Sequence, residues 1–424
     1  MTHDTPWPQG ARPILMTGMF DMHNFGDLMF PLIARAHLAP RGFDIRPVSA
    51  TGITPDLADA PASVALPQAI GQAAAGVLIG GGYIVHGHRL DLLREYRDGD
   101  VGAWVGAGSW LGGTLLAALG DMPLAWNAPG VPHHLFGPVK TLAAPAFAAA
   151  DYFNLRDEGS QRLAGTPAQI VPDTVIDLPM VWTAAELASD FRQMLQRLDL
   201  PGDGRILAVH LRGRSLGKEP LEDFAPKLQA TCEQLGLTPV FVGLGSAHND
   251  NKIARALRDA MTIPSAALDK PLALREIAAL LAHAQGYIGS SLHGYVGAFA
   301  YGRPAVLVGR PAYWKFTGFI DHVDRPQDLA LDWDAALAKL AAQPRAGALP
   351  ARTRQALDRH WATVADTFDA GATPGRAGRM AFLRAYMQAG MAQYGASWPM
   401  QPLTTAPALA AAASGDDVRG KEPI

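Results

Sequence analysis

A histidine that follows two serines is the residue of this sequence best suited to chemistry. Residues 286–288 read as an apolar strand, and Ser290 and Ser291 lead into a helix that contains His293 and Gly294. A helix N-terminus disfavours a protonated imidazole but attracts an anion, so a neutral His293 could act as a donor or proton relay beside a phosphate. His293 could equally be a capping residue, and the residues alone leave both interpretations open.

A second residue suited to anions stands at the end of another apolar run. Residues 206–211 form that run, and Arg212 and Gly213 follow it. The planar guanidinium of arginine matches a carboxylate or phosphate through two parallel hydrogen bonds, and the adjoining glycine leaves room for the ligand. We therefore expect Arg212 to contact an anionic group.

The N-terminal half of the chain places polar residues and glycines directly after its apolar runs. Ligands of open α/β sheets gather at the carboxyl ends of strands, so these residues could line a cleft. They are Asn24, Gly26, Asp27, Gly80, Gly81, Gly82, Arg156 and Asp173. Asn24 and Asp27 could instead cap a helix, and Arg156 could pair with Asp173 for structural reasons. The glycines match neither the lysine-containing phosphate loop nor the spaced dinucleotide fingerprint.

Metal and thiol chemistry are not indicated. Cys232 is the single cysteine of the chain, so neither an internal disulfide nor a cysteine-rich zinc site can form. No His-Glu-x-x-His pattern occurs. We interpret the remaining histidines of interest as surface or capping residues: His86, His88, His133, His134 and His322. The sequence predicts a reaction without a tightly bound transition metal or other cofactor.

The composition indicates a folded and nearly neutral protein. The 36 Lys and Arg against 39 Asp and Glu give a formal charge of −3, which does not favour nucleic acid or an anionic membrane as a partner. Hydrophobic residues make up 49% and charged residues 18%, unlike a disordered chain. Residues 1–10 lack the order of a secretory signal, and one cysteine fits a reducing compartment. We expect a cytoplasmic protein.

One uncharged segment invites a membrane interpretation. Residues 101–120 carry no charge over about the length of a spanning helix, but six of them are glycine. We favour a strand over residues 101–105, a glycine turn and then a helix. No integral membrane segment is therefore expected, and a membrane-spanning helix is the alternative.

Short apolar runs alternate with alanine-rich helical stretches in two successive blocks, a pattern typical of parallel sheets with crossover helices. The first block has runs at residues 13–17, 76–79, 103–105, 152–155 and 169–171. The second has runs at residues 206–211, 238–242, 286–288 and 305–308. Two α/β domains are expected, with the ligand site in the cleft between them.

The predicted divisions follow from these blocks. They are an N-terminal domain over residues 1–182, a linker over 183–204, a C-terminal domain over 205–345, helices over 346–397 and a disordered tail over 398–424. The helical patterns lie at about residues 351–368 and 378–394 and could brace the two domains. The tail is rich in proline and alanine.

The order of these motifs resembles that of the polysaccharide pyruvyltransferase family over roughly residues 13–320. The matching motifs are Asn24-x-Gly26-Asp27, Gly80-Gly81-Gly82, Arg156-Asp157 with Ser160, Asp173, and Ser290-x-Leu292-His293-Gly294 with Gly302-x-Pro304. The resemblance implies a GT-B-like fold of two facing Rossmann-like domains. It also implies phosphoenolpyruvate as donor and, as acceptor, a sugar of a surface polysaccharide or glycolipid precursor, which could be lipid-linked. The N-terminal domain would then be the acceptor side and the C-terminal domain the donor side, where His293 and Arg212 would contact the donor. Further donor-binding residues are expected at Ser290, Ser291, Gly294 and Lys315.

The sequence departs from the family pattern at one position. Many members have arginine where Ser291 stands, so the anionic groups of the donor must find other cations. The candidates are Arg156, Arg212, Arg310 and Lys315. Forming a pyruvate ketal needs an acid, for which His293 is suited, and Asp27 could accept a hydroxyl proton. Three tryptophans could stack on a sugar or simply pack: Trp104, Trp110 and Trp314.

Two other functions remain open. The same fold supports nucleotide-sugar glycosyltransferases, although no clear glutamate that could hold a donor ribose follows His293. The serine at Ser291 also leaves room for a relative that binds a sugar or anion without catalysis. Release of phosphate from phosphoenolpyruvate, against release of nucleotide from a nucleotide sugar, separates these alternatives.

Overall fold

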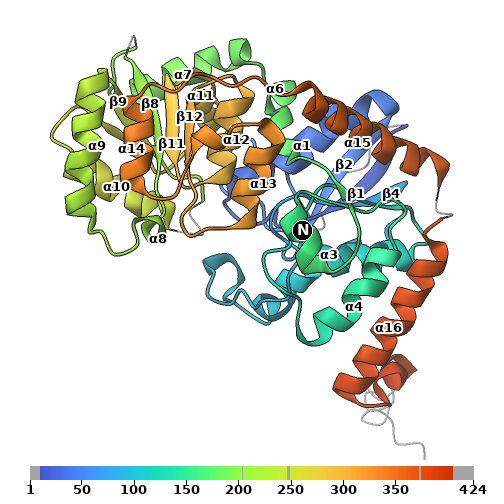
Figure 1. Ribbon diagram of the computed structural model, residues 1–424. Coiled ribbons are helices and arrows are strands. Elements are labelled where there is room, and N and C mark those ends of the chain that lie inside the picture. The colour runs from blue at the N-terminus through green and yellow to red at the C-terminus, as the bar shows by residue number, and fades with distance from the viewer. Residues whose placement is uncertain (1–9, 203, 246–248, 372–373, 404–424) are drawn as a thin grey trace, which may run out of the picture.

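Two parallel β-sheets form the cores of two α/β domains that lie side by side (Figure 1). The structure is a computed structural model and describes residues 10–202, 204–245, 249–371 and 374–403. The strands are mostly buried, as expected for parallel sheets covered by helices on both faces.

The first sheet has the strand order β3-β2-β1-β4-β5. Its strands are β1 (Arg12–Thr17), β2 (Phe43–Ser49), β3 (Val64–Ala65), β4 (Gly76–Ile79) and β5 (Leu124–Trp126). Helix α1 (Phe25–Leu38) connects β1 to β2, and α3 (Val101–Leu119) lies between β4 and β5. Since the order reverses direction after β1, the ends of β1 and β4 flank the switch point at which such sheets bind ligands.

The second sheet repeats this arrangement with the order β10-β9-β8-β11-β12-β13. Its strands are β8 (Ile206–His210), β9 (Thr238–Val242), β10 (Ala266–Leu268), β11 (Gly286–Gly289), β12 (Ala305–Val308) and β13 (Leu329–Ala330). Its helices are α8 (Gly213–Leu216), α9 (Leu221–Leu235), α10 (Asp250–Ala260), α11 (Leu274–His283), α12 (Leu292–Ala300), α13 (Trp314–Val323) and α14 (Trp333–Ala341). The switch point lies between β8 and β11, which end at His210 and Gly289. The expected fold class, two Rossmann-like domains in a GT-B-like arrangement, is confirmed.

The predicted strand at residues 101–105 is wrong, because these residues begin helix α3. Glycines let this helix pack closely: a Cβ on Gly106 would fall 2.4 Å from a backbone oxygen of His88, and one on Gly113 would fall 2.5 Å from Thr17. Within the described residues, α3 is the helix long and apolar enough to cross a membrane, and 67% of its most apolar window is buried in the protein. It is a core helix of the first domain.

Two predicted runs form no full strand of the first sheet, although Tyr152 makes one isolated parallel bridge to Ala125 of β5. β6 (Asn154–Leu155) and β7 (Gln169–Ile170) pair with each other as a separate two-stranded sheet. They lie before and after α5 (Glu158–Ala164), which begins at the N-cap Asp157. This small unit carries Arg156 to the boundary between the domains.

The segment predicted as a linker is mostly helical. Helix α7 (Ala184–Arg197) begins with a capping box formed by Thr183 and Glu186. It packs against α11, and the imidazole of His283 hydrogen-bonds to the backbone oxygen of Ala184 at 2.8 Å. The segment 183–204 is therefore part of the second domain rather than an open connection.

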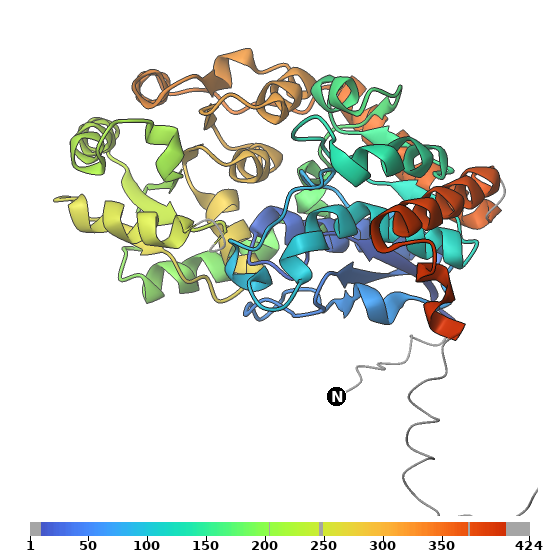
Figure 2. The ribbon, with the colours of Figure 1, turned by 90° about the horizontal axis from the view of Figure 1, so that it is seen from below.

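Two C-terminal helices return to the first domain. Helix α16 (Arg376–Tyr394) packs on α3 and α4 (Gly137–Ala148), along the outside of the first domain and away from the second (Figure 2). The predicted disordered tail starts at residue 398, but residues 398–403 form a short 3-10 helix that contacts α16. The rest of that tail lies outside the described residues.

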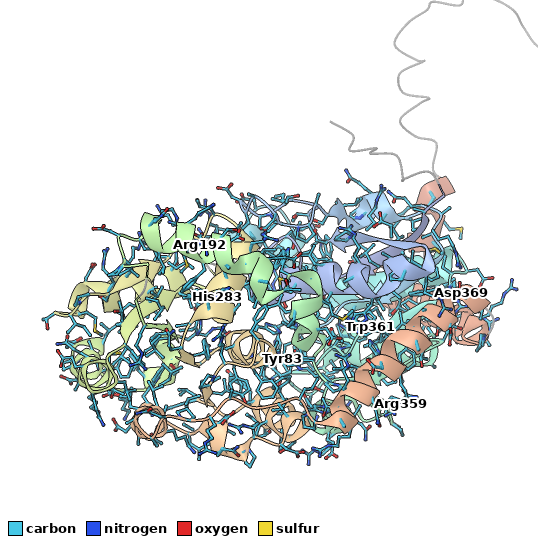
Figure 3. The ribbon with its side chains drawn as sticks, turned by 90° about the horizontal axis from the view of Figure 1, so that it is seen from above. Tyr83, Arg192, His283, Arg359, Trp361 and Asp369 are labelled. Atoms are coloured by element: carbon cyan, nitrogen blue, oxygen red, sulfur yellow. The ribbon has the colours of Figure 1, made fainter. Side chains whose placement is uncertain are left out.

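Helix α15 (Ala351–Ala370) contacts both domains. At its start, Thr353 donates a hydrogen bond to the backbone oxygen of His322 on α13. Farther along, Trp361 stacks on His37 of α1, and at its end Asp369 pairs with Arg12 of β1 (Figure 3). This helix therefore fastens the second domain to the first.

Candidate active site

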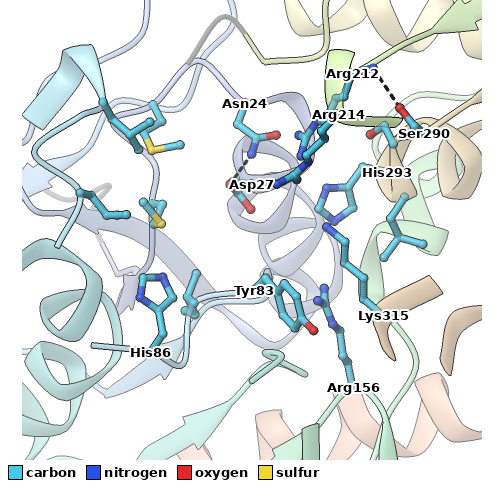
Figure 4. Close-up of a pocket in the computed structure, with 17 residues that line it drawn as sticks. Asn24, Asp27, Tyr83, His86, Arg156, Arg212, Arg214, Ser290, His293 and Lys315 are labelled. Carbon is cyan, nitrogen blue, oxygen red and sulfur yellow. Dashed lines mark hydrogen bonds between the residues drawn. The ribbon is translucent and has the colours of Figure 1, made fainter. Parts of the chain in front are cut away.

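The two domains enclose a cavity of about 220 Å³ at the carboxyl ends of their sheets (Figure 4). Eight of the residues expected from the sequence line it. They are Asn24, Asp27, Arg156, Arg212, Ser290, Ser291, His293 and Lys315. Residues from distant parts of the chain therefore meet at one site, as the switch points of the two sheets require.

His293 lies in the first turn of α12 and faces the first domain. Its N-cap is Ser291, whose side-chain oxygen accepts a hydrogen bond from the backbone N–H of Gly294 at 3.4 Å. The Nε2 atom of His293 lies 3.4 Å from a carboxylate oxygen of Asp173. On the Nδ1 side the ring lies against Gly26, where an added Cβ would come within 1.6 Å of Nδ1. The glycine motif at residue 26 thus makes room for this imidazole.

Asp173 lies behind His293 and joins it to Arg156. The same carboxylate oxygen is 3.5 Å from a guanidinium nitrogen of Arg156, and both side chains are almost fully buried. Burial would raise the pKa of Asp173, but the charges of His293 and Arg156, with the hydrogen bond from the backbone N–H of Val175, outweigh it and hold that pKa below its ordinary value. Asp173 is therefore a carboxylate that orients two functional side chains without lining the cavity.

Four cationic side chains converge on the cavity: Arg156, Arg212, Arg214 and Lys315. The backbone N–H of Arg212 donates to the side chain of Ser290 at 3.0 Å, which links the ends of β8 and β11. Burial, together with the charges of the three arginines, lowers the pKa of Lys315 well below its ordinary value. This concentration of positive charge can compensate an anionic ligand with two charged groups.

Two of the four cations are also held by rings. The guanidinium carbon of Arg156 lies 4.4 Å from the ring centre of Tyr83, and the Nζ atom of Lys315 lies 5.2 Å from the same ring. In the described part of the chain, two nitrogens of Arg156 are buried without a hydrogen-bond partner, although Asp157 lies 3.4 Å away. Buried donors of this kind are expected to bind a ligand.

Asp27 is the acidic residue of the cavity wall. The amide nitrogen of Asn24 donates to its carboxylate at 2.7 Å, so Asn24 occupies the N-cap position of α1 without capping the helix through its side chain. Burial raises the pKa of Asp27, although the charges of His293 and nearby cations act in the opposite direction. A carboxyl group with a raised pKa accepts a proton more readily than an ordinary one.

Other expected residues do not reach the cavity. Gly80, Gly81 and Gly82 pack beneath it, and a Cβ on Gly82 would fall 2.7 Å from Asp27. Gly26 and Gly294 likewise serve close packing. Three further candidates have other surroundings: Arg310 is exposed, Trp110 is fully buried in the core, and Trp314 is half-exposed outside the cavity. Trp104 does not line the cavity either.

One wall of the cavity was not expected from the sequence, and two histidines lie elsewhere than on the surface. Arg214, Tyr83 and His86 line the cavity, and so do the side chains of Met19, Met22, Ile84, Leu90 and Leu93. His86 is buried rather than on the surface, and His322 is half-buried with its ring nitrogen 2.9 Å from the backbone oxygen of Arg156. In the sequence, only the position of Arg214 two residues after Arg212 could have indicated that it lines the site.

The family profile of polysaccharide pyruvyl transferases matches residues 24–311, which include every expected site residue except Trp314 and Lys315. The chain belongs to the polysaccharide pyruvyl transferase family. It is accordingly a transferase enzyme, and the family implies a pyruvate donor and a polysaccharide acceptor. In this pyruvyl transferase, three of the four predicted replacement cations line the cavity despite the serine at Ser291. Arg214 adds a fourth cation there, whereas Arg310 does not line the cavity.

Solved structures with a similar arrangement share little sequence with this pyruvyl transferase. The S. aureus MnaA–UDP co-structure shares 10% identity, with 90% of this chain and 96% of that chain covered and a TM-score of 0.46. The UDP-GlcNAc 2-epimerase from Neisseria meningitidis shares 11% identity, with 89% of this chain and 99% of that chain covered and a TM-score of 0.45. The UDP-GlcNAc 2-epimerase from Methanocaldococcus jannaschii shares 11% identity, with 83% and 99% covered and a TM-score of 0.46. No curated protein matches the chain. These likenesses carry no argument about activity.

Proposed function

We propose that the protein transfers pyruvate from phosphoenolpyruvate to two hydroxyls of a sugar, forming a ketal and releasing phosphate. The acceptor sugar belongs to a surface polysaccharide or glycolipid precursor, and the reaction takes place in the cytoplasm. The observation that carries the proposal is the convergence of Arg156, Arg212, Arg214 and Lys315 on one cavity beside His293. Phosphoenolpyruvate offers a carboxylate and a phosphate to these cations.

The reaction needs a proton on the methylene carbon of the donor. Nε2 of His293 is buried toward Asp173, so the proposed mechanism assigns the proton transfer to Nδ1, which lies beside Gly26, a residue without a side chain. In the proposed step, His293 gives its proton to the methylene carbon while Asp173 stabilises the charged imidazole. The adjacent carbon becomes cationic and takes the first sugar hydroxyl.

The second bond forms as phosphate leaves. The second hydroxyl attacks the same carbon, the bond from that carbon to the phosphate oxygen breaks, and the cations stabilise the departing phosphate. Of the two hydroxyl protons, one replaces the proton lost from His293 and the other leaves with phosphate. Asp27, with its raised pKa, accepts a hydroxyl proton during this exchange.

A comparison of released products tests the proposal. The purified protein is incubated with phosphoenolpyruvate and a panel of sugar acceptors, and phosphate release is measured beside nucleotide release from UDP-sugars. Acceptor-dependent phosphate release is expected. Release of nucleotide alone would assign the protein to the glycosyltransferases, and absence of both, together with tight binding of phosphoenolpyruvate, would indicate a binding protein.

A further inference from the structure

The cavity has two unlike halves. The cations and His293 lie on one side, whereas His86 lies on the other, across from Arg212 and Arg214 (Figure 4). Besides His86, five side chains form an apolar wall: Met19, Met22, Ile84, Leu90 and Leu93. A charged group placed against this wall would lose its hydration without compensation, whereas an apolar group would gain from burial.

His86 supplies a hydrogen-bond donor of fixed direction to this wall. Its Nδ1 accepts a hydrogen bond from the backbone N–H of His88 at 3.2 Å, and its backbone oxygen accepts from the indole of Trp110 at 3.0 Å. Burial, with the electrostatic influence of the neighbouring His88 and His133, lowers the pKa of His86 to about 4. The ring is therefore neutral near pH 7 and carries its proton on Nε2.

The apolar wall is pre-formed. Most of it comes from the segment between β4 and α3, which is held at several points. The backbone N–H of Leu90 donates to the oxygen of Gly102 at 2.7 Å, and that of Val85 donates to Gly130 at 3.1 Å. The hydroxyl of Tyr96 donates to Asp21 at 2.5 Å in the core below. A ligand therefore meets a fixed surface rather than a loop that must first be ordered.

We propose that the apolar wall and His86 form the acceptor subsite and select an uncharged sugar with an apolar substituent, an acetamido or deoxy methyl group, over a hexuronic acid. The inference rests on the proposed function in placing the donor in the cationic half. Asn24 and Asp27 line the same cavity, where a hydroxyl of the bound sugar can meet the Asp27 carboxyl. The Nε2–H of His86 donates to an oxygen of the sugar.

Saturation-transfer NMR tests this selectivity directly. The probes are the methyl glycosides of an N-acetylhexosamine, a 6-deoxyhexose and a hexuronic acid, each with phosphoenolpyruvate present so that the uronate cannot pair with free cations. We expect transfer of saturation from the protein to the acetyl or deoxy methyl protons, and no transfer of saturation to the uronate. Equal transfer to the uronate, or no transfer to any of the three, would overturn the proposal.

Two neighbouring leucines provide a matched pair of variants. Leu93 lines the cavity, whereas Leu92 is 93% exposed. Leu93→Asp should abolish transfer to the methyl protons, since a carboxylate then faces the apolar group, and Leu92→Asp should leave it unchanged. The same loss in both variants, or in neither, would contradict the assignment of this wall.

Variants of His86 test the hydrogen bond that its Nε2–H donates to the sugar. Glutamine keeps an N–H near the position of Nε2, so His86→Gln should retain binding, whereas His86→Ala should raise the half-saturating sugar concentration roughly tenfold. His134→Ala, at an exposed histidine, is the control. Titration with phosphoenolpyruvate separates the two proposals. If it fails to bind while the neutral glycosides do, the proposed function fails and the sugar subsite stands; the opposite result removes the subsite alone.

Discussion

His293 of the second domain rests on Gly26 of the first, with its Nδ1 side against the position that a side chain would occupy. Gly26 lies in the first turn of α1, and His293 lies in the first turn of α12. The backbone N–H of Phe25 also donates to the oxygen of Leu244 at 2.8 Å, so the start of α1 is tied to the second domain. The proposed acid, His293, therefore lies at the contact between the two domains.

Gly26→Ala should therefore remove activity without unfolding the protein. The added Cβ would lie 1.6 Å from Nδ1, so the imidazole must move. General acid catalysis contributes roughly a hundred- to ten-thousand-fold to the rate. The rate of single-turnover phosphate release should therefore decrease by a factor in that range. Gly202→Ala is the control, because a Cβ there meets no atom of the described residues within 4 Å. Wild-type turnover in Gly26→Ala would show that the position of the imidazole is immaterial.

Arg212→Ala should weaken donor binding by about 2 to 5 kcal/mol, because one charged group of the donor loses its partner. In a titration with phosphoenolpyruvate this corresponds to a Kd roughly 30- to 5,000-fold higher. Arg310→Ala removes an exposed arginine outside the cavity and should leave the Kd unchanged. Similar losses in both variants would indicate a diffuse charge effect rather than a contact of Arg212.

Lys315 should make donor binding depend on pH. Burial and the neighbouring arginines lower its pKa, so its charge is lost at a lower pH than for an ordinary lysine. The anionic donor favours the charged form, so the Kd should rise with pH by at most about tenfold per unit. Above pH 7 the phosphate, with its second pKa near about 6, keeps an almost constant charge.

The variant Lys315→Arg identifies the source of this pH dependence. Arginine stays charged throughout the accessible range, so the rise of the Kd should disappear. Isothermal titration with phosphoenolpyruvate at several pH values measures both proteins. An identical rise in the variant would assign the titration to another group.

The contact of α15 with the first domain should contribute strongly to stability. Asp177 is buried, lies 2.8 Å from a ring nitrogen of His37, and pairs with Arg354 of α15. Asp177→Asn should lower the free energy of unfolding on the order of 3 kcal/mol at pH 7, since a buried partner of two groups is lost. Asp358→Asn removes the exposed partner of Arg354 and should change the free energy of unfolding by less than about 0.5 kcal/mol.

The sign of the pH dependence checks the same contact. Burial would raise the pKa of Asp177, but its hydrogen bonds with His37 and Arg354 hold that pKa below its ordinary value. Its stabilisation is therefore complete above the pKa of the unfolded chain, about 4, and is lost as the pH falls through the folded value. In urea unfolding, the difference between Asp177→Asn and wild type should shrink below about pH 4. A constant difference would contradict this.

The fold could be predicted where strands are continuous apolar runs. β4, β8 and β12 are such runs and were expected within a residue or so. β2 was missed because Asp44, Arg46 and Pro47 interrupt its apolar pattern. β5 and β10 were missed because each is only three residues long and its environment, rather than its sequence, makes it a strand.

The cationic half of the site was predictable for a related reason. Arg212, Ser290 and His293 follow apolar strands, and the end of a parallel strand is a position that sequence reveals. The role of Asp173 as a partner of His293 depends on tertiary contact across 120 residues and left no local pattern. His86 and most of the apolar wall lie in the segment between β4 and α3, which has no periodicity, so no pattern in the sequence marked them as lining a site.

The two halves of the cavity are built from different kinds of backbone, and this has a consequence for divergence. The cationic side chains and His293, the proposed acid, are held by the pairing of β8 with β11 and by the first turns of helices. A substitution at these positions therefore disturbs the sheet. The apolar wall comes mostly from one continuous stretch between β4 and α3, anchored at its own ends. That stretch can be exchanged as a cassette, which would let new acceptor preferences arise while the chemistry of the donor is inherited intact.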